Sequence, residues 1–179
     1  IIQRATICSS VRLPLQQIGV YFSLYLQSTA YYVASLHDVT KLLVPLCRQQ
    51  LSRLVFAKRP WLQQRYLASL LAWLRVAPVT APDVDLTVAT VGLYLRRYGA
   101  HSLVNGGAPR GAPPASFARY VRRQLRCWLP HWDHSAWTRW VSMLDGAATK
   151  RAERAALRTF KYELISVARL RAKTYLADR

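Results

Sequence analysis

Proline, glycine and helix-capping residues divide this chain of 179 residues into segments whose apolar residues recur every three or four positions. This spacing places apolar side chains on one side of an α-helix, whereas a half-buried strand requires strict alternation. No segment of the sequence shows sustained alternation. We therefore predict an all-α fold with about seven helices, arranged as an irregular helical array or bundle.

The first four predicted helices lie before residue 100. They are expected to begin at Pro14, after Asp38, at Pro60 and after Asp83, because proline suits a first helical turn and aspartate suits an N-cap. The first reaches Leu36 and the third reaches Leu74. Pro45 should kink or restart the second helix, and the fourth should end at Gly99.

A glycine- and proline-rich linker, residues 105–115, cannot form regular structure. It separates an apolar helical region, residues 1–104, from a basic helical region, residues 116–179. Residues 119–179 alone carry half of the net charge of the chain. In the basic region we predict three helices, with Ser116, Ser135 and Thr149 as N-caps, over Phe117–Trp128, Ala136–Leu144 and from Thr149 to about Ala177.

The charge of the chain is one-sided, with 26 Lys and Arg residues against 8 Asp and Glu residues and a net charge of +18. Self-repulsion of this size destabilises a compact isolated monomer and favours a polyanionic partner. Arginine accounts for 21 of the basic residues, and its planar guanidinium suits phosphate and base stacking. A GC-rich genome also explains an arginine excess, but it does not explain the scarcity of acids.

The helix predicted directly after the linker separates apolar from basic side chains. Its apolar side holds Phe117, Val121, Leu125 and Trp128. Four arginines lie within about 100° of one another on the other side: Arg119, Arg122, Arg123 and Arg126. Because like charges three or four residues apart repel, a row of RNA phosphates would offset their repulsion. A solvated helix face is the alternative.

The last predicted helix repeats this arrangement over a longer stretch. Its apolar stripe consists of Leu157, Phe160, Leu164, Val167, Tyr175 and Leu176. Seven basic residues occupy a neighbouring arc of about 140°: Lys150, Arg151, Arg154, Arg158, Lys161, Arg169 and Lys173. We predict that both basic sets contact RNA phosphates rather than base edges. An anionic membrane surface is the second interpretation of this helix.

Residues with catalytic or metal-binding chemistry are few and scattered. Cys127, His131 and His134 are close in sequence, but zinc needs four ligands and no second pair has a matching spacing. Cys8 and Cys47 are remote, so a disulfide framework is excluded and a reducing compartment fits. No phosphate-binding loop, serine nucleophile motif or neighbouring carboxylate pair occurs. We expect no enzyme activity, no metal and no cofactor.

Two further patterns have competing explanations. Four of the six tryptophans lie within residues 128–140, and we expect them to pack helices together rather than to stack on bases. Residues 67–75 align with residues 88–96, in a pattern that loosely resembles the helix pairs of organellar RNA-binding helical-repeat proteins. Two apolar helices of biased composition explain the alignment better, since no third copy keeps the spacing.

The uncharged segment Leu13–Leu36 is long enough to cross a bilayer. Glutamines, serines and four tyrosines interrupt it, and this favours a buried helix in a large assembly over a membrane span. The amino end before Asp38 lacks acids and holds Arg4 and Arg12 with several serines and threonines. Such a composition resembles the sequence that follows a mitochondrial targeting segment.

In composition and helix pattern the whole chain resembles the lineage-specific helical proteins of mitochondrial ribosomes, and most closely the GC-rich, arginine-heavy type of protists such as euglenozoans. The resemblance rests on no family motif. It implies a structural, rRNA-binding protein of the mitochondrial matrix that also contacts neighbouring proteins of a large assembly. Two alternatives stay open. One is an accessory subunit of an inner-membrane respiratory complex or ATP synthase, with Leu13–Leu36 touching lipid. The other is a free-standing RNA-processing factor.

Overall fold

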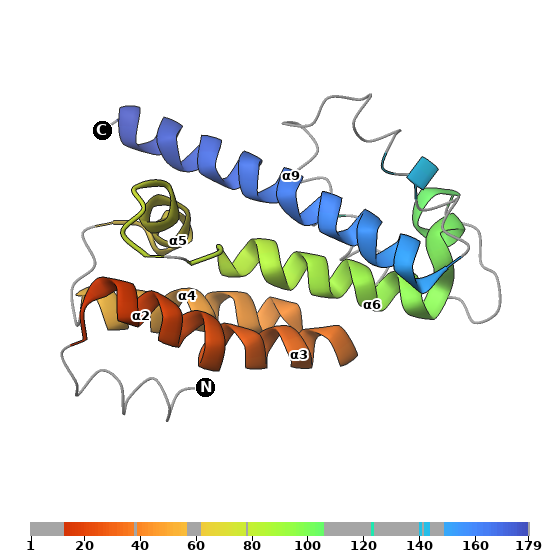
Figure 1. Ribbon diagram of the computed structural model, residues 1–179, viewed down its shortest axis with the longest axis horizontal. Helices are drawn as coiled ribbons and strands as arrows, with labels where there is room; N and C mark the ends of the chain where they lie inside the picture. Colours follow the sequence, from red (N-terminus) through yellow and green to blue (C-terminus); the bar gives the residue numbers. More distant parts are fainter. Residues whose placement is uncertain are drawn as a thin grey trace.

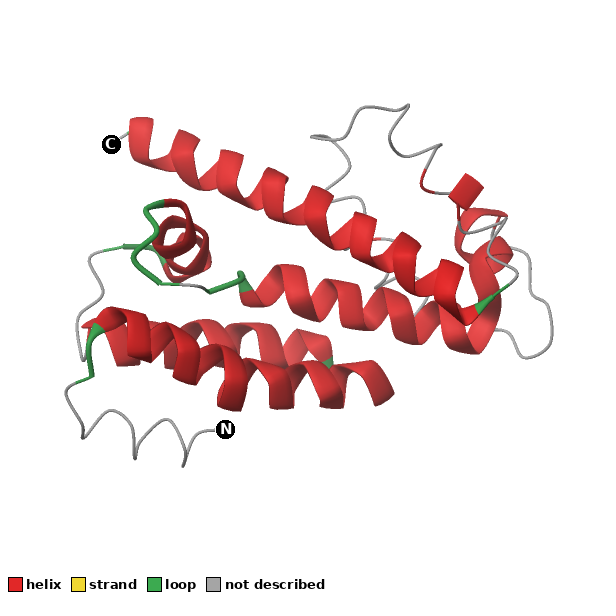
Figure 2. Cartoon of the chain, viewed as in Figure 1, coloured by secondary structure: helices red, strands yellow, loops and turns green. Residues whose placement is uncertain are grey.

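The computed structural model describes residues 13–37, 39–56, 62–77, 79–105, 123, 140, 142–143 and 149–178. Every regular element in these ranges is helical and none is a strand, so the all-α prediction is confirmed (Figure 2). The elements are α2 (Leu15–Tyr21), η1 (Phe22–Gln27), α3 (Ser28–Leu36), α4 (Thr40–Phe56), α5 (Gln64–Trp73), α6 (Pro82–Asn105) and α9 (Lys150–Ala177). Because α2, η1 and α3 are continuous, the described part holds five helices rather than about seven.

Helix α6 forms the centre of the fold (Figure 1). It packs against α3 and α4 on one side and against α9 on another. Every residue from Val84 to Leu95 is buried, and Tyr94 is among the largest fully buried side chains. A helix that is buried around its whole circumference, here with only Asp85, Thr87 and Thr90 as polar residues in this stretch, is stable only when other helices surround it. The other helices therefore act as layers around α6.

The first helix contains a π-helical segment, η1, between two α-helical parts. Its buried residues recur every four positions: Ile18, Phe22, Leu26, Ala30 and Ala34. In an α-helix of 3.6 residues per turn, a four-residue repeat rotates steadily away from its starting side. The wider π turn contains more residues per turn and so keeps these positions facing α4 and α6. The sequence predicted the helix but not this segment.

Helix α9 begins where the sequence predicted, because the Thr149 hydroxyl accepts a hydrogen bond from the Ala152 backbone N–H at 3.2 Å. Its buried residues also recur mainly every four positions: Ala156, Phe160, Leu164, Val167, Ala168 and Ala172. Such a stripe winds around a straight helix, so α9 crosses its neighbours obliquely. It packs on both α6 and α5, and Figure 1 shows it diverging from α6 towards its C-terminus, where α5 lies beside it.

Three predicted helix boundaries are wrong. Helix α6 continues through Gly99 to Asn105, because one glycine costs a helix only about 1 kcal/mol. Helix α5 begins at Gln64, after buried Leu62 and an extended Gln63. Asp83 lies in the first turn of α6 rather than at its N-cap, because Pro82 occupies the first helical position.

Pro45 neither interrupts nor restarts α4, which is continuous from Thr40 to Phe56. The proline lies on the exposed side of the helix. There, water can hydrogen-bond the carbonyl group that loses its partner. Asp38 and Pro60, which were predicted to start the second and third helices, lie outside the described residues.

Helix α5 ends in a Schellman motif whose left-handed position is an arginine. The Val76 N–H donates to the Leu71 carbonyl at 3.0 Å, and the Arg75 N–H donates to the Ala72 carbonyl at 3.2 Å. Arg75 has φ of 56° and is exposed. Glycine is the usual residue here, because a side chain in this conformation costs about 1–2 kcal/mol. Arg75 is therefore a strained residue on the surface.

The core joins residues from both predicted regions. Buried residues of α3, α4, α5 and α6 form one cluster with Phe160 and Leu164 of α9. The linker beyond Asn105 and most of residues 116–148 lie outside the described residues, so the boundary between the regions stays a prediction. Trp140 is buried and stacks on Phe160 with ring centroids 4.7 Å apart, which confirms the packing role for this tryptophan.

The two aligned segments, 67–75 and 88–96, do not occupy equivalent environments. Segment 88–95 is buried throughout in the middle of α6, whereas Trp73, Leu74 and Arg75 are exposed at the end of α5. Helix α5 packs mainly on α9 and α4. The two segments therefore lack the side-by-side packing of a repeated helix pair.

Candidate functional site

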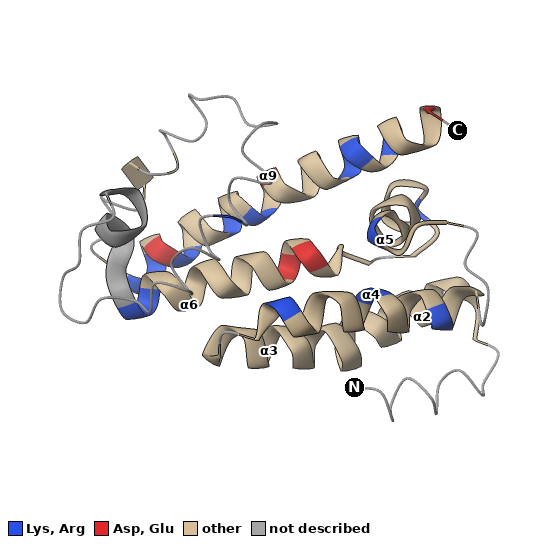
Figure 3. Ribbon diagram, turned by 180° about the vertical axis from the view of Figure 1, so that it is seen from behind, with Lys and Arg blue, Asp and Glu red and all other residues tan. Residues whose placement is uncertain are grey.

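The exposed side of α9 carries most of its predicted phosphate-binding residues. Six of the seven are exposed: Lys150, Arg151, Arg154, Arg158, Arg169 and Lys173. We call this set the basic face. Figure 3 shows lysine and arginine along the length of α9, and acidic residues at the start of both α6 and α9. Arg151, Arg154 and Arg158 form no ion pair with another described residue.

Lys161, the seventh predicted residue, turns towards the protein interior. Its Nζ lies 2.6 Å from Asp85 Oδ1, and its side chain is 37% exposed against 13% for Asp85. The buried stripe of α9 winds around the helix and, at Ala168 and Ala172, lies on the same side of α9 as Lys161. Lys161 therefore faces the neighbouring helices rather than solvent alone. The sequence-based prediction assumed that the apolar side of the helix keeps one direction along its length. It therefore grouped Lys161 with the exposed basic residues.

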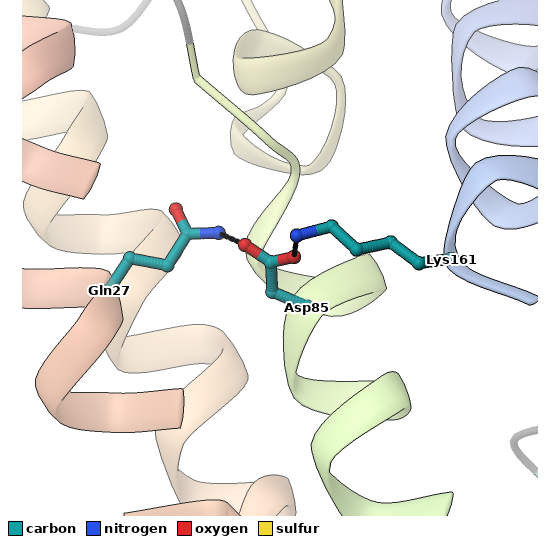
Figure 4. Close-up of polar contacts among 3 residues, drawn as sticks. All are labelled: Gln27, Asp85 and Lys161. Carbon is teal, nitrogen blue, oxygen red and sulfur yellow. Dashed lines mark hydrogen bonds and ion pairs between the residues drawn. The ribbon is translucent and has the colours of Figure 1, made fainter. Parts of the chain in front are cut away.

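Asp85 joins three helices through its two carboxylate oxygens (Figure 4). Gln27 of η1 donates a hydrogen bond from Nε2 to Asp85 Oδ2, and Lys161 of α9 pairs with Oδ1. Asp85 lies in the first turn of α6, where the helix dipole stabilises a negative charge. Gln27 is 3% exposed. This polar contact fixes the positions of η1, α6 and α9 relative to one another.

Several arginines outside α9 are also used within the protein. Arg48 Nη2 of α4 lies 3.0 Å from Asp83 Oδ2 of α6. Arg96 and Arg97 of α6 donate to the carbonyl oxygens of Ser35 and Leu36, the latter at 2.9 Å. These two carbonyl groups lie at the C-terminus of α3, where backbone carbonyls lack a hydrogen-bond partner within the helix, and the two guanidinium groups supply one. The sequence does not reveal these roles, because each joins residues 35 to 61 positions apart.

The C-terminal part of the basic face lies beside aromatic rings. Lys173 Nζ is 5.0 Å from the centroid of the Trp73 ring, and Tyr66 stacks on Tyr175 with centroids 4.4 Å apart. A lysine above an indole ring gains a cation–π interaction. Trp73 is 41% exposed. Positive charge and aromatic surface are therefore adjacent where α5 meets α9.

The other predicted phosphate-binding set is only partly described. Arg123 is helical and exposed. Arg119, Arg122 and Arg126 lie outside the described residues, as do Cys127, His131 and His134. The helix from Phe117 to Trp128 therefore stays a prediction.

The described residues show no cluster of three or more potential metal ligands. Cys47 is fully buried in the core, and burial raises the pKa of its thiol to about 11. A protonated, buried thiol is unreactive towards electrophiles and metals. Within the described ranges, no helix is both long enough and apolar enough to span a membrane.

In comparisons with known proteins, no family model matches this chain, and no curated protein or solved structure shows significant similarity to it.

Proposed function

We propose that this protein is a structural, rRNA-binding component of a mitochondrial ribosome or a related organellar ribonucleoprotein, located in the mitochondrial matrix. The observation that carries the proposal is the basic face of α9, on which Arg151, Arg154 and Arg158 are exposed and form no ion pair with another described residue. Guanidinium groups in such a row match the spacing and charge of a phosphate backbone. The predicted set Arg119, Arg122, Arg123 and Arg126 would extend the same interaction.

The buried side of α9 supports a structural role for this helix. Phe160 and Leu164 anchor it in the core, and the Asp85–Lys161 ion pair fixes its rotation. Phosphate contacts position a protein on RNA without reading its sequence. The exposed apolar side chains of η1 and α3, including Leu24 and Tyr32, would contact neighbouring proteins.

The same apolar side chains favour a second candidate, an accessory subunit of an inner-membrane respiratory complex or ATP synthase. In that assembly, Leu24 and Tyr32 would touch lipid or membrane-embedded subunits. The net charge of +18 favours RNA over this alternative.

Sedimentation of a mitochondrial lysate distinguishes the two candidates. We expect the protein to co-sediment with a ribosomal subunit and to move to the top of the gradient after RNase treatment. Carbonate-resistant membrane association that RNase does not change would contradict the ribosomal assignment. It would favour the membrane complex.

Two double variants sharpen this experiment. The α9 double variant, Arg154→Glu with Arg158→Glu, reverses two charges of the basic face. The control double variant, Arg53→Glu with Arg65→Glu, makes the same change in net charge at exposed positions of α4 and α5. We expect only the α9 double variant to leave the particle.

A further inference from the structure

A groove of about 650 Å³ lies where the loop after α5 meets α2 and the C-terminal half of α9. At the left of Figure 1, α5 and the loop after it lie between α2, below, and the C-terminal half of α9, above. The volume falls within the range of about 300–1,000 Å³ that is typical of small-ligand sites. The groove is separate from the N-terminal half of the basic face, which holds Arg151, Arg154 and Arg158.

Two arginines from different segments border this groove, Arg75 of the loop and Arg169 of α9. Both are exposed, and none of the described residues that line the groove is acidic. Guanidinium groups bind phosphate through paired N–H donors. The charge of the groove therefore suits a phosphate group.

The remaining lining suits a flat, mostly apolar ring with polar edges. The apolar surface comes from Val20, Ala72, Val76, Ala77 and Val79. Gln16 and Thr80 add an amide and a hydroxyl group at the same groove, and both can donate and accept hydrogen bonds. A nucleobase has this combination of apolar faces and hydrogen-bonding edges.

The backbone at Arg75 supplies an independent argument. Its φ of 56° fits glycine, yet the position holds the longest basic side chain. Backbone strain that the surrounding structure maintains is often associated with a functional side chain. The Arg75 side chain forms no ion pair with another described residue. An ion pair within the described part of the fold therefore does not explain why arginine occupies this position.

We infer that this groove binds a single unpaired nucleotide of RNA, with its phosphate at Arg75 and Arg169 and its base on the apolar surface between α2 and the α5–α6 loop. The inference rests on the proposed function, because Arg169 belongs to the basic face. Bases stacked and paired in a duplex cannot enter such a groove. An apolar peptide would leave both guanidinium groups without an anionic partner.

Binding of two RNA probes to the whole chain tests this inference. The probes are a fluorescein-labelled 12-nucleotide oligouridine and a 12-base-pair RNA duplex, measured by fluorescence anisotropy. Arg75→Gly and Arg75→Asn both remove the guanidinium and both tolerate the backbone conformation. We expect each to weaken oligouridine binding about tenfold, the effect of losing hydrogen bonds to a charged group, and to change duplex binding less than twofold. Arg53→Ala, which removes an exposed charge on α4, should not change the ratio of the two affinities.

The outcomes separate this inference from the proposed function. If the wild-type protein binds neither probe, both are wrong. If it binds both probes and the Arg75 variants weaken them equally, the groove does not select an unpaired nucleotide and the inference alone is wrong. Uridine monophosphate that competes as tightly as the oligomer would show a mononucleotide site and would also overturn the assignment to RNA.

Discussion

Individual charged residues of this protein divide into those that hold the fold together and those that face solvent. Asp85 is the clearest structural example, because it binds Gln27 and Lys161 from two other helices. Arg75 is the clearest opposite example, since it occupies a strained conformation and is exposed. We therefore expect loss of an Asp85 partner to lower the free energy of unfolding, and replacement of Arg75 by glycine to raise it.

Replacing Arg75 by glycine should stabilise the protein. Relief of the left-handed strain is worth about 1–2 kcal/mol, and the greater freedom of glycine in the unfolded chain offsets about 0.4–1 kcal/mol of it. We expect a net gain between about 0 and 1.6 kcal/mol, and each kcal/mol raises Tm by roughly 2–4 °C in a domain of this size. Thermal unfolding followed by circular dichroism measures this change. Arg53→Gly, within α4, should lower Tm instead, and a lower Tm for Arg75→Gly would show that the arginine side chain stabilises the fold.

Helix α9 combines a structural and a solvent-facing role because its buried stripe winds around it. Lys161 lies where the stripe approaches the basic residues, whereas Arg158 lies on the exposed side three residues earlier. The sequence placed both residues in one basic arc. The structure separates them through the Lys161–Asp85 pair.

Substitution of these two neighbours should therefore affect different properties. Lys161→Met leaves the Asp85 carboxylate without its cation, and we expect a loss of about 1–2 kcal/mol in the free energy of unfolding. The salt dependence of RNA binding should stay unchanged. Arg158→Met should leave stability unchanged and lower the slope of log K against log salt by about 0.7–0.9. Urea denaturation and RNA titrations at several salt concentrations measure both properties. A lower slope for Lys161→Met would mean that this lysine leaves Asp85 to contact RNA.

The periodicity of the sequence was sufficient to predict the helical elements but not how they meet. Thr149 was correctly predicted as the cap of α9, because an N-cap depends on local hydrogen bonds. The π segment η1 and the winding of the α9 stripe depend on which helix lies opposite, and the contact of Gln27 with Asp85 joins residues 58 positions apart. The positive φ of Arg75 follows from the end of α5 and has no glycine to indicate it.

At the scale of the whole molecule, a buried central helix coexists with an apolar surface on the first helix. Leu24 is 61% exposed and Tyr32 is 66% exposed, on a segment without any charge from Leu13 to Leu36. From this surface and the net charge of +18, we expect a protein that is stable mainly within an assembly.

The isolated protein should accordingly self-associate, and polar substitutions on this surface should reduce that tendency. We expect Leu24→Gln with Tyr32→Gln to increase the monomer fraction in sedimentation velocity experiments at moderate salt. Leu170→Gln changes an exposed leucine of α9 outside this surface, and it should have little effect. Wild-type protein that stays fully monomeric without RNA in the same experiment would contradict this view.

The salt dependence of RNA binding by the α9 double variant tests the central claim most directly. Wild-type binding should weaken steeply with salt, because each phosphate that is neutralised adds about 0.7–0.9 to the slope of log K against log salt. We expect the α9 double variant to lower this slope by about 1.4–1.8, and the control double variant, which has the same net charge, to leave it within about half a unit of wild type. Equal slopes for the two double variants would contradict the account, because the basic face would then contribute only through net charge.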